Sequence, residues 1–321
     1  MSFTHTITNH TIQKILAEAF PHEKVSSTEL LVGGLINSNI KVEFESGREP
    51  VVLRVYRDGP EVCRKEVALI ELIQSQVPVS RIVYASANTD VCAELPAFAI
   101  FAFVPGITFQ QLKRSGSLEA IQQAACSVGA TLAAIGKFQF PKSGRLQLND
   151  GVEVGKPFIE GPDPIPRLLD TFLESPKCKS RAGAKLVNQL HEFCWSRSSL
   201  MPDLDSRPSL VHCDFGNRNI LVREQNGRWV VASVLDWEFA MSGSPLLDVG
   251  HFLRYEKFDE PLREPHFSQA FLENGGNLPQ SWREIVRLID LTALVECLTH
   301  DELPSDVESE LLALIRATLV N

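Results

Sequence analysis

The sequence lacks the cysteine patterns that indicate disulfide frameworks or zinc sites. It has seven cysteines, an odd number, and no Cys-x-x-Cys pair. This argues against both a disulfide framework and a zinc cage, and it fits a reducing compartment. Most of these thiols have apolar neighbours, which predicts that they are buried: they are Cys63, Cys92, Cys126, Cys178, Cys194, Cys213 and Cys297.

Targeting and membrane-spanning signals are also missing. Residues 1–6 contain no charged start followed by an apolar run, so we expect no signal peptide. No apolar stretch reaches the length of a membrane span, and the expected location is the cytoplasm, with no membrane partner. The net charge of −9 comes from 40 acidic and 31 basic residues. Since an acidic chain repels phosphate backbones, we expect no nucleic-acid partner.

The chain is long enough for one large domain or two lobes that share a cleft. It has 321 residues, of which 44% are hydrophobic and 22% charged, as in ordinary globular proteins. We find no internal repeat and no low-complexity tract. A helix capped by Asn9 is expected to end before Pro21. The composition does not indicate an oligomeric state.

A β-rich stretch follows this helix. Alternating apolar residues predict strands over 40–44 and 51–56, and a helix is predicted from Pro60 to about Gln76. The apolar run 97–104 predicts a further strand. Pro105-Gly106 then punctuates the chain. We therefore predict a β-rich N-terminal lobe, residues 1–104, and a C-terminal lobe, residues 105–321.

The C-terminal lobe is predicted to be mainly helical. Apolar residues recur at spacings of three and four between Leu118 and Ile135, which indicates one buried helix face. Residues 141–208 are expected to mix loops with short helices. A strand-rich island at 210–236 follows, and the rest of the chain is expected to be helical. The predicted fold class is thus α+β.

The island at 210–236 carries the polar residues that suggest chemistry. His212 and Asp214 are followed by Asn219, in the order His-x-Asp-x-x-x-x-Asn. A short strand follows, and then Asn226-Gly227, a strong signal for a two-residue hairpin turn. The return strand ends at Asp236.

The hairpin brings two oxygen ligands together. A turn at Asn226-Gly227 places residue 219 opposite roughly residue 234, so Asn219 and Asp236 share the open end. Magnesium prefers a few hard oxygens and leaves room for water and phosphates. Asp214 precedes the hairpin on a loop, where it can accept a proton from an attacking hydroxyl, as phosphoryl transfer requires.

Other interpretations of these residues stay open. The hairpin could be a structural one whose Asp and Asn cap turns. His212 could be catalytic, although a buried scaffold role is favoured. His212 and Asp214 with His251 or His266 would match an iron(II) oxygenase site. Such sites usually lie in β-barrels, and this interpretation leaves Asn219 and Asp236 unexplained.

The island resembles the catalytic and metal loops of the aminoglycoside phosphotransferase family, which includes choline-kinase-like enzymes. The resemblance covers roughly residues 25–300 and implies a protein-kinase-like fold. It implies an ATP-dependent small-molecule kinase that transfers the γ-phosphate to a hydroxyl of an aminoglycoside-like, amino-alcohol or other metabolite acceptor. The implied cofactors are ATP, with GTP possible, and Mg²⁺. The implied roles are base for Asp214, magnesium ligand for Asn219 and Asp236, and support of the catalytic loop for Asp248 and His212.

The N-terminal lobe carries weaker parts of the same resemblance. Gly33 to Asn39 resembles a phosphate-covering loop, and Arg54 lies in a strand whose basic residue contacts nucleotide phosphates in the family. Glu66 falls on the apolar stripe of its helix and needs a partner, for which Arg54 is the natural choice. Alternatively, Glu66 lies at the edge of the stripe and reaches solvent. Ala102 and Val104 resemble the hinge that pairs with adenine, to within one residue.

Two further alternatives and the acceptor remain open. A non-catalytic nucleotide-binding protein with a kinase-like fold is the main rival. A dinucleotide-binding oxidoreductase is less favoured, because this sequence has no Gly-x-Gly-x-x-Gly signature after its first strands. The sequence does not identify the acceptor. Glu238, Asp290 and Glu296 are acidic residues that could receive a cationic acceptor or could simply be solvated.

Overall fold

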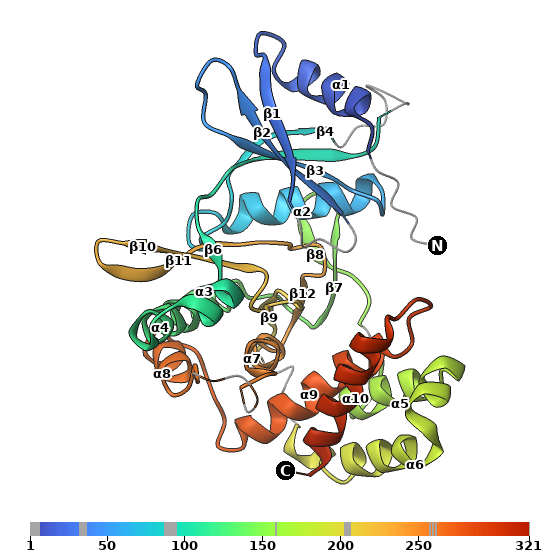
Figure 1. Cartoon of the computed structure of the whole chain (residues 1–321). Coiled ribbons are helices and arrows are strands. Elements are labelled where there is room, and N and C mark those ends of the chain that lie inside the picture. Colours follow the sequence, from blue (N-terminus) through green and yellow to red (C-terminus); the bar gives the residue numbers. More distant parts are fainter. Residues whose placement is uncertain are drawn as a thin grey trace. The chain divides into compact units, whose positions relative to one another are not determined.

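The computed structural model describes residues 7–31, 37–86, 95–157, 159–201, 207–256, 258, 260 and 262–320. The chain divides into two compact units (Figure 1). Unit 1 comprises Met1–Gly116, Gln147–Glu153 and Arg218–Glu238, and unit 2 comprises Ser117–Leu146, Val154–Asn217 and Phe239–Asn321. The lobe boundary at residues 104 and 105 stays a proposal.

Unit 1 is built on a five-stranded sheet with the strand order β1-β2-β3-β5-β4. Every neighbouring pair is antiparallel. The pairs β1–β2, β2–β3 and β4–β5 are consecutive in the chain, whereas helix α2 and β4 lie between β3 and β5. The strands are β1 (Val25–Leu30), β2 (Ser38–Phe44), β3 (Val51–Val55), β4 (Ile82–Ser86) and β5 (Phe98–Ala102). The strands predicted from alternating apolar residues are therefore present.

Two helices cover this sheet, on opposite faces in Figure 1. Helix α1 (Asn9–Ala19) is capped by Thr8 rather than Asn9, because the Thr8 hydroxyl accepts from the backbone N–H of Thr11 at 3.2 Å. Its apolar residues join one core with β2, β3 and β5. Helix α2 (Pro60–Ile73) contacts β4 and β5 and begins with proline, whose fixed φ suits a first helical position.

Unit 1 also contains the predicted hairpin. Strands β10 (Ile220–Gln225) and β11 (Arg228–Val234) are joined by Asn226 and Gly227, both with positive φ, as a type I′ turn requires. Ile220 pairs with Val234, and the register shifts by one residue between Leu221 and Val222. The short β6 (Ile107–Thr108) pairs with β10, and α3 (Phe109–Ser115) follows it.

Unit 2 is mainly helical. Helix α9 packs against α5, α7 and α10, and α4 packs against α8. Its helices are α4 (Leu118–Ile135), α5 (Pro164–Leu173), α6 (Pro176–Trp195), η1 (Ser198–Leu200), α7 (Leu246–Leu253), α8 (His266–Glu273), α9 (Trp282–Cys297) and α10 (Ser305–Leu319). Strands β9 (Ser209–Val211) and β7 (Gly144–Leu148) flank β12 (Met241–Gly243). The end of β7 and most of β8 (Val152–Val154) belong to the Gln147–Glu153 segment of unit 1.

The prediction for residues 141–208 was wrong in part. Strands β7 and β8 lie where only loops and short helices were expected, and α6 is a 20-residue element. Gly183, with φ 77°, breaks the helical geometry inside α6. An interior glycine and few apolar residues weaken the periodic signal on which the prediction depended.

Helix α4 is the buried centre of its part of unit 2. Gly129 lets α8 approach so closely that a Cβ there would lie 2.3 Å from the backbone oxygen of Phe267. By length and composition alone α4 would be able to cross a membrane, contrary to the sequence expectation, but over half of it is buried in the protein. Burial against α8 explains its apolar composition.

Candidate active site

Arg54 is the centre of a buried charge cluster in unit 1. It lies on β3, and its side chain is 7% exposed. Its Nε lies 3.2 Å from Glu66 Oε2, and its Nη2 donates a short hydrogen bond to Asp236 Oδ1. The predicted contact between Arg54 and Glu66 is therefore present. Burial opposes the charge on Arg54, but the Glu66 and Asp236 carboxylates raise its pKa above the ordinary value.

Glu66 faces inward on α2, as the apolar stripe of that helix predicted. It is 2% exposed. Its Oε1 accepts the backbone N–H of Trp237 at 3.0 Å, while Oε2 contacts Arg54 electrostatically without hydrogen-bond geometry. The carboxylate therefore links β3 to the segment that carries Asp236. The alternative in which Glu66 reaches solvent is wrong.

Glu238 completes the cluster. Its Oε2 accepts a 2.6 Å hydrogen bond from the side-chain amide of Asn37, and Arg54 Nη2 lies 3.6 Å from the same oxygen. Burial and the nearby Asp236 carboxylate raise the pKa of Glu238 to about 7. Lys65 donates to the backbone oxygen of Glu238 at 2.6 Å. The Glu238 side chain is thus engaged within unit 1.

Asn219 and Asp236 flank the open end of the hairpin, as predicted. The backbone N–H of Leu235 donates to the backbone oxygen of Asn219 at 2.8 Å, which continues the ladder by one step. Asp236 has φ 68°, a left-handed conformation that Asp tolerates better than most residues. An amide and a carboxylate are hard oxygen donors of the kind Mg²⁺ prefers. This donor set fits a magnesium ion that keeps further positions for water and phosphate.

The residues predicted to form a catalytic loop belong to unit 2, where Asp248 fixes their backbone. Asp248 is fully buried near the start of α7, and its two carboxylate oxygens accept the N–H groups of His212 at 2.7 Å and Cys213 at 2.9 Å. Cys213 has φ 67°, which is costly for a residue with a side chain. The two charge-assisted hydrogen bonds stabilise this turn, which directly precedes Asp214.

His212 has the geometry of a scaffold residue. It is fully buried, and its Nδ1 accepts the backbone N–H of Asp214 at 3.2 Å. Since Nδ1 is the acceptor, the proton of the neutral ring lies on Nε2. The side chain of Asp214 itself is 43% exposed. His212 therefore orients the loop, while Asp214 presents its carboxylate to solvent.

His251 lies next to Asp214. It is on α7, and its Nε2 is 3.8 Å from Asp214 Oδ1, too far for a hydrogen bond. Burial, and to a lesser degree the electrostatic interactions with Arg254 and His212, lower the pKa of His251 well below its usual range. The imidazole beside Asp214 is therefore neutral at pH 7. Sequence reasoning assigned His251 only to the oxygenase alternative.

The described residues give no support to that oxygenase alternative. Among them, no group of three or more His, Cys, Asp and Glu side chains is placed to hold a metal ion. The fold is an antiparallel sheet and a helical unit rather than the β-barrel that the alternative required. The described residues and the fold therefore do not favour the oxygenase interpretation.

The segments predicted to form the hinge and the phosphate-covering loop are described only in part. The N–H of Ala102 donates to the backbone oxygen of Arg81 at 2.8 Å, so this donor is already used. Val104 follows two residues later, beyond the end of β5. Most of the glycine-containing stretch, residues 32–36, lies outside the described residues. Asn37, which follows it, is held by Glu238.

Sequence reasoning missed the connections between distant segments of unit 1. Arg54 and Asp236 are 182 positions apart, and Asn37 and Glu238 are 201 apart. One local sequence pattern could have indicated these contacts: two acidic residues, Asp236 and Glu238, flank the apolar Trp237 directly after a strand. Acidic residues in such an apolar setting need buried partners.

A family model describes most of this chain. Residues 27–285 match the model of the phosphotransferase enzyme family. Among curated proteins, the human "Acyl-CoA dehydrogenase family member 11" is 27% identical over 207 residues, which cover 64% of this chain and 24% of that protein. The Gallus gallus protein of the same name is 25% identical over 243 residues, which cover 74% of this chain and 29% of that protein. The chain thus spans only 24% to 29% of the length of these relatives.

Solved structures share the fold along nearly the whole chain. A thermostable mutant of an aminoglycoside phosphotransferase, in ternary complex with AMP-PNP and hygromycin B, has a TM-score of 0.67 at 19% identity and covers 97% of this chain and 98% of its own. A choline kinase from Streptococcus pneumoniae has a TM-score of 0.63 at 13% identity, covering 97% and 98%. A microcompartment-associated aminopropanol kinase has a TM-score of 0.61 at 16% identity, covering 96% and 95%.

These comparisons confirm the predicted fold class, an α+β protein-kinase-like fold with a β-rich N-terminal region and a helical C-terminal part. The family match covers the Arg54 cluster, the hairpin and the loop fixed by Asp248. Together they show that this chain belongs to the phosphotransferase enzyme family.

Proposed function

We propose that the chain is a small-molecule kinase that transfers the γ-phosphate of ATP to a hydroxyl group. The observation that carries the proposal is the double contact of Arg54 in unit 1, with Glu66 on one side and Asp236 on the other. A guanidinium has five N–H groups, so Arg54 can keep both carboxylates and still offer a donor to phosphate. The cluster thus joins a phosphate-binding cation to a magnesium-binding carboxylate.

The proposed roles follow from the surroundings of each side chain. Asp214 accepts the proton of the acceptor hydroxyl, since its carboxylate is exposed on a loop that His212 and Asp248 hold in place. Asn219 and Asp236 hold Mg²⁺, which when bound neutralises the charge on the nucleotide phosphates. His212 and Asp248 contact neither nucleotide nor acceptor in this proposal. They position the backbone of Asp214.

The nucleotide is proposed to be ATP, with GTP as the alternative. Similar structures were solved with AMP-PNP and with GDP, which supports a nucleotide in general rather than one base. Arg54 is proposed to contact the phosphates, with Glu66 holding it in position. Ala102 and Val104 are proposed as the hinge, and because the Ala102 N–H is used within unit 1, Val104 is the donor toward the base.

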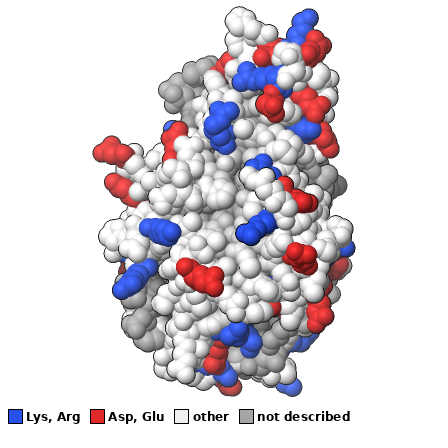
Figure 2. Space-filling model, turned by 90° about the vertical axis from the view of Figure 1, so that its left-hand side faces the viewer, with Lys and Arg blue, Asp and Glu red and all other residues white. Residues whose placement is uncertain are grey.

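The acceptor is proposed to be a small hydroxylated metabolite. The similar structures are named for aminoglycosides, choline and aminopropanol, and the curated relatives for acyl-CoA dehydrogenation. Each name suggests a chemical class of acceptor to include in a panel of test compounds. Nucleic acid is not proposed as a partner, and on the face shown in Figure 2 basic and acidic side chains are interspersed without a continuous basic patch. A cytoplasmic location stays a proposal.

The test is nucleotide consumption across such a panel. The full chain, ATP or GTP and Mg²⁺ are incubated with amino alcohols, aminoglycosides, sugars, hydroxy acids and hydroxylated acyl compounds, and ADP or GDP release is followed. Acceptor-dependent release with one class supports the kinase. A thermal-shift titration without response to either nucleotide with Mg²⁺ would contradict it. Nucleotide binding without turnover of any class would favour the non-catalytic alternative.

A further inference from the structure

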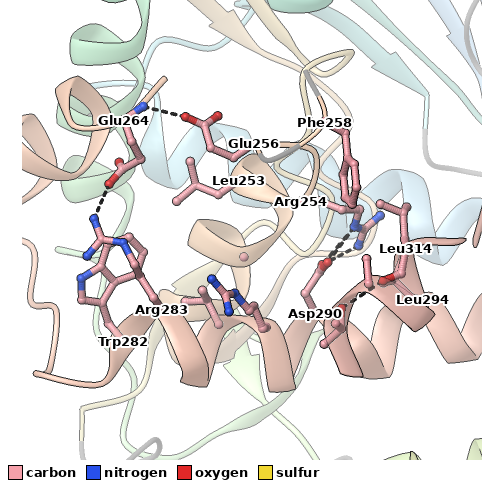
Figure 3. Close-up of a pocket in the computed structure, with 15 residues that line it drawn as sticks. Leu253, Arg254, Glu256, Phe258, Glu264, Trp282, Arg283, Asp290, Leu294 and Leu314 are labelled. Carbon is pink, nitrogen blue, oxygen red and sulfur yellow. Dashed lines mark hydrogen bonds and ion pairs between the residues drawn. The ribbon is translucent and has the colours of Figure 1, made fainter. Parts of the chain in front are cut away.

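Unit 2 contains a cavity of about 260 Å³ next to the helix that carries His251 (Figure 3). Its walls come from the end of α7, from α9, from α10 and from the segment that connects α7 to α8. Apolar side chains form much of the lining, among them Leu253, Val286, Leu294 and Leu314. A concave apolar site with a few placed polar groups is the usual form of a small-molecule site.

The acidic residues of this cavity are already engaged. Asp290 accepts three hydrogen bonds from Arg254, at 2.6, 2.9 and 3.1 Å. Glu264 accepts from Arg283 at 3.0 Å, and Glu256 accepts from the buried Arg263 at 2.6 Å. Each carboxylate in the lining therefore has its own arginine. A polycationic acceptor would have to displace arginines to find a counter-charge here, which is costly for the buried pairs Arg254–Asp290 and Arg263–Glu256.

Arg254 combines a fixed position with a remaining donor. It follows α7 directly, and its side chain is 14% exposed. All its hydrogen bonds to Asp290 use Nε and Nη2, so one edge of the guanidinium is occupied and Nη1 is left for a ligand. Figure 3 shows the pair at one end of the cavity, beside Phe258. An arginine held in this way is preorganised to bind a carboxylate or phosphate.

The same arginine lies close to the proposed base within unit 2. Arg254 comes three residues after His251, which is about 4.5 Å along a helix and on the same face. His251 in turn is 3.8 Å from Asp214. Cys297, on α9, interacts electrostatically with Asp214 and with the Arg254–Asp290 pair. Burial raises the pKa of its thiol, Arg254 lowers this pKa, and the Asp214 and Asp290 carboxylates raise it. An anion at Arg254 and a hydroxyl at Asp214 would be on the order of 10 Å apart.

We propose that this cavity binds the acceptor, and that the acceptor is a hydroxylated compound with a single oxyanion, a carboxylate or a phosphate, that binds Arg254 and is joined to the hydroxyl by an apolar chain. The inference rests on the proposed kinase function and names its acceptor class. From the sequence alone, Asp290 could receive a cationic acceptor. In this proposal Asp290 instead positions Arg254, which binds an anionic one.

The test uses matched acceptors that differ only in charge. 6-Hydroxyhexanoate, 1,6-hexanediol and 6-amino-1-hexanol share one chain, and 6-hydroxyhexyl phosphate distinguishes a phosphate from a carboxylate site. Binding to the full chain with Mg²⁺ and AMP-PNP is measured by calorimetry, and turnover with ATP is measured in parallel. At least one oxyanion is expected to bind about tenfold or more tightly than the diol, and the amine is expected to bind more weakly than the diol.

The variants isolate Arg254. Arg254→Gln/Asp290→Asn removes both charges, so that no buried charge is left unpaired, and it should raise Kd and KM for the oxyanion about tenfold or more with little change in kcat. Arg197→Gln, which breaks an exposed 2.9 Å contact with Glu284 in the same unit, is the matched control and should leave Kd unchanged. Arg283→Gln tests the other end of the cavity, and a larger effect there would make the assignment to Arg254 wrong.

The outcomes separate the two proposals. If the diol or the amine is bound and phosphorylated and the oxyanions are not, the acceptor class is wrong and the kinase proposal stands. If the oxyanion binds through Arg254 but neither ATP nor GTP is consumed with any probe, the kinase proposal fails and the binding site stands. Absence of oxyanion binding, or binding that the double variant leaves unchanged, would overturn the inference.

Discussion

Asp248→Asn offers a sharp test of how the proposed catalytic loop is held. Asp248 is fully buried and accepts two backbone N–H groups, those of His212 and Cys213. Burial raises the pKa of Asp248 from 3.8 to about 7, the two hydrogen bonds oppose the shift, and Asp214 adds to it. Asparagine removes the titrating proton and supplies only one acceptor oxygen.

The sign of the pH dependence follows from linkage. The native state binds the Asp248 proton more tightly than the unfolded state does, so this group stabilises the protein at low pH, and that stability is lost as pH rises through about 7. Between pH 5 and pH 8 the loss amounts to about 3 kcal/mol. Asp248→Asn abolishes this contribution, so the free-energy advantage of the wild type over the variant should be about 3 kcal/mol smaller at pH 8 than at pH 5.

Urea unfolding of both proteins at pH 5, 6, 7 and 8 measures this difference. Asp248→Ala is the internal control, because it also lacks the titrating group but removes the acceptor of one buried and one part-buried N–H group, at up to about 1–3 kcal/mol each. The two variants should differ from each other by a constant amount across the pH range. An advantage of the wild type that does not change with pH would refute the argument that burial dominates the protonation of Asp248.

Two further predictions concern packing and charge. Gly129→Ala should lower the free energy of unfolding by about 2 kcal/mol or more, because its Cβ would meet the backbone of α8 at 2.3 Å, whereas Gly151→Ala, with nothing within 4 Å, should stay within about 0.5 kcal/mol in the same denaturation assay. Arg54→Met should cost about 3–5 kcal/mol because it leaves buried carboxylates without a cation. The double variant Arg54→Met/Glu66→Gln should lose less than the sum of the single variants, and strict additivity would show that the two side chains are not coupled.

Local patterns predicted helices α1 and α2, strands β2, β3 and β5, the β10–β11 hairpin and one key contact of unit 1, but not β1, β6 or α3. Asn226-Gly227 specified the hairpin and hence the shared end of Asn219 and Asp236, because a two-residue turn fixes the register. The predicted register was one residue off at that end, since a bulge separates Leu221 from Val222. A bulge adds one residue on one strand and has no strong sequence signature here.

Contacts between distant segments were less predictable. The stripe on α2 implied a partner for Glu66, and Arg54 was found, because both lie on elements close in sequence. The engagement of Asp236 by Arg54 depends on how a hairpin far along the chain packs on the sheet. Likewise, Asp290 has the sequence context of a solvated or cation-binding residue, and only the packing of α7 on α9 supplies its partner, Arg254.

The most direct test of the proposed function compares Asp214→Asn with Asp236→Asn. Nucleotide binding with and without Mg²⁺ is measured by calorimetry, and turnover is measured with an acceptor found in the panel. Asp214→Asn should abolish turnover and leave Mg²⁺-dependent nucleotide affinity nearly intact, because Asp214 acts on the acceptor hydroxyl. Asp236→Asn should weaken that affinity, because it removes a formal charge beside the metal. Loss of nucleotide binding in Asp214→Asn, or unchanged binding in Asp236→Asn, would contradict the assigned roles.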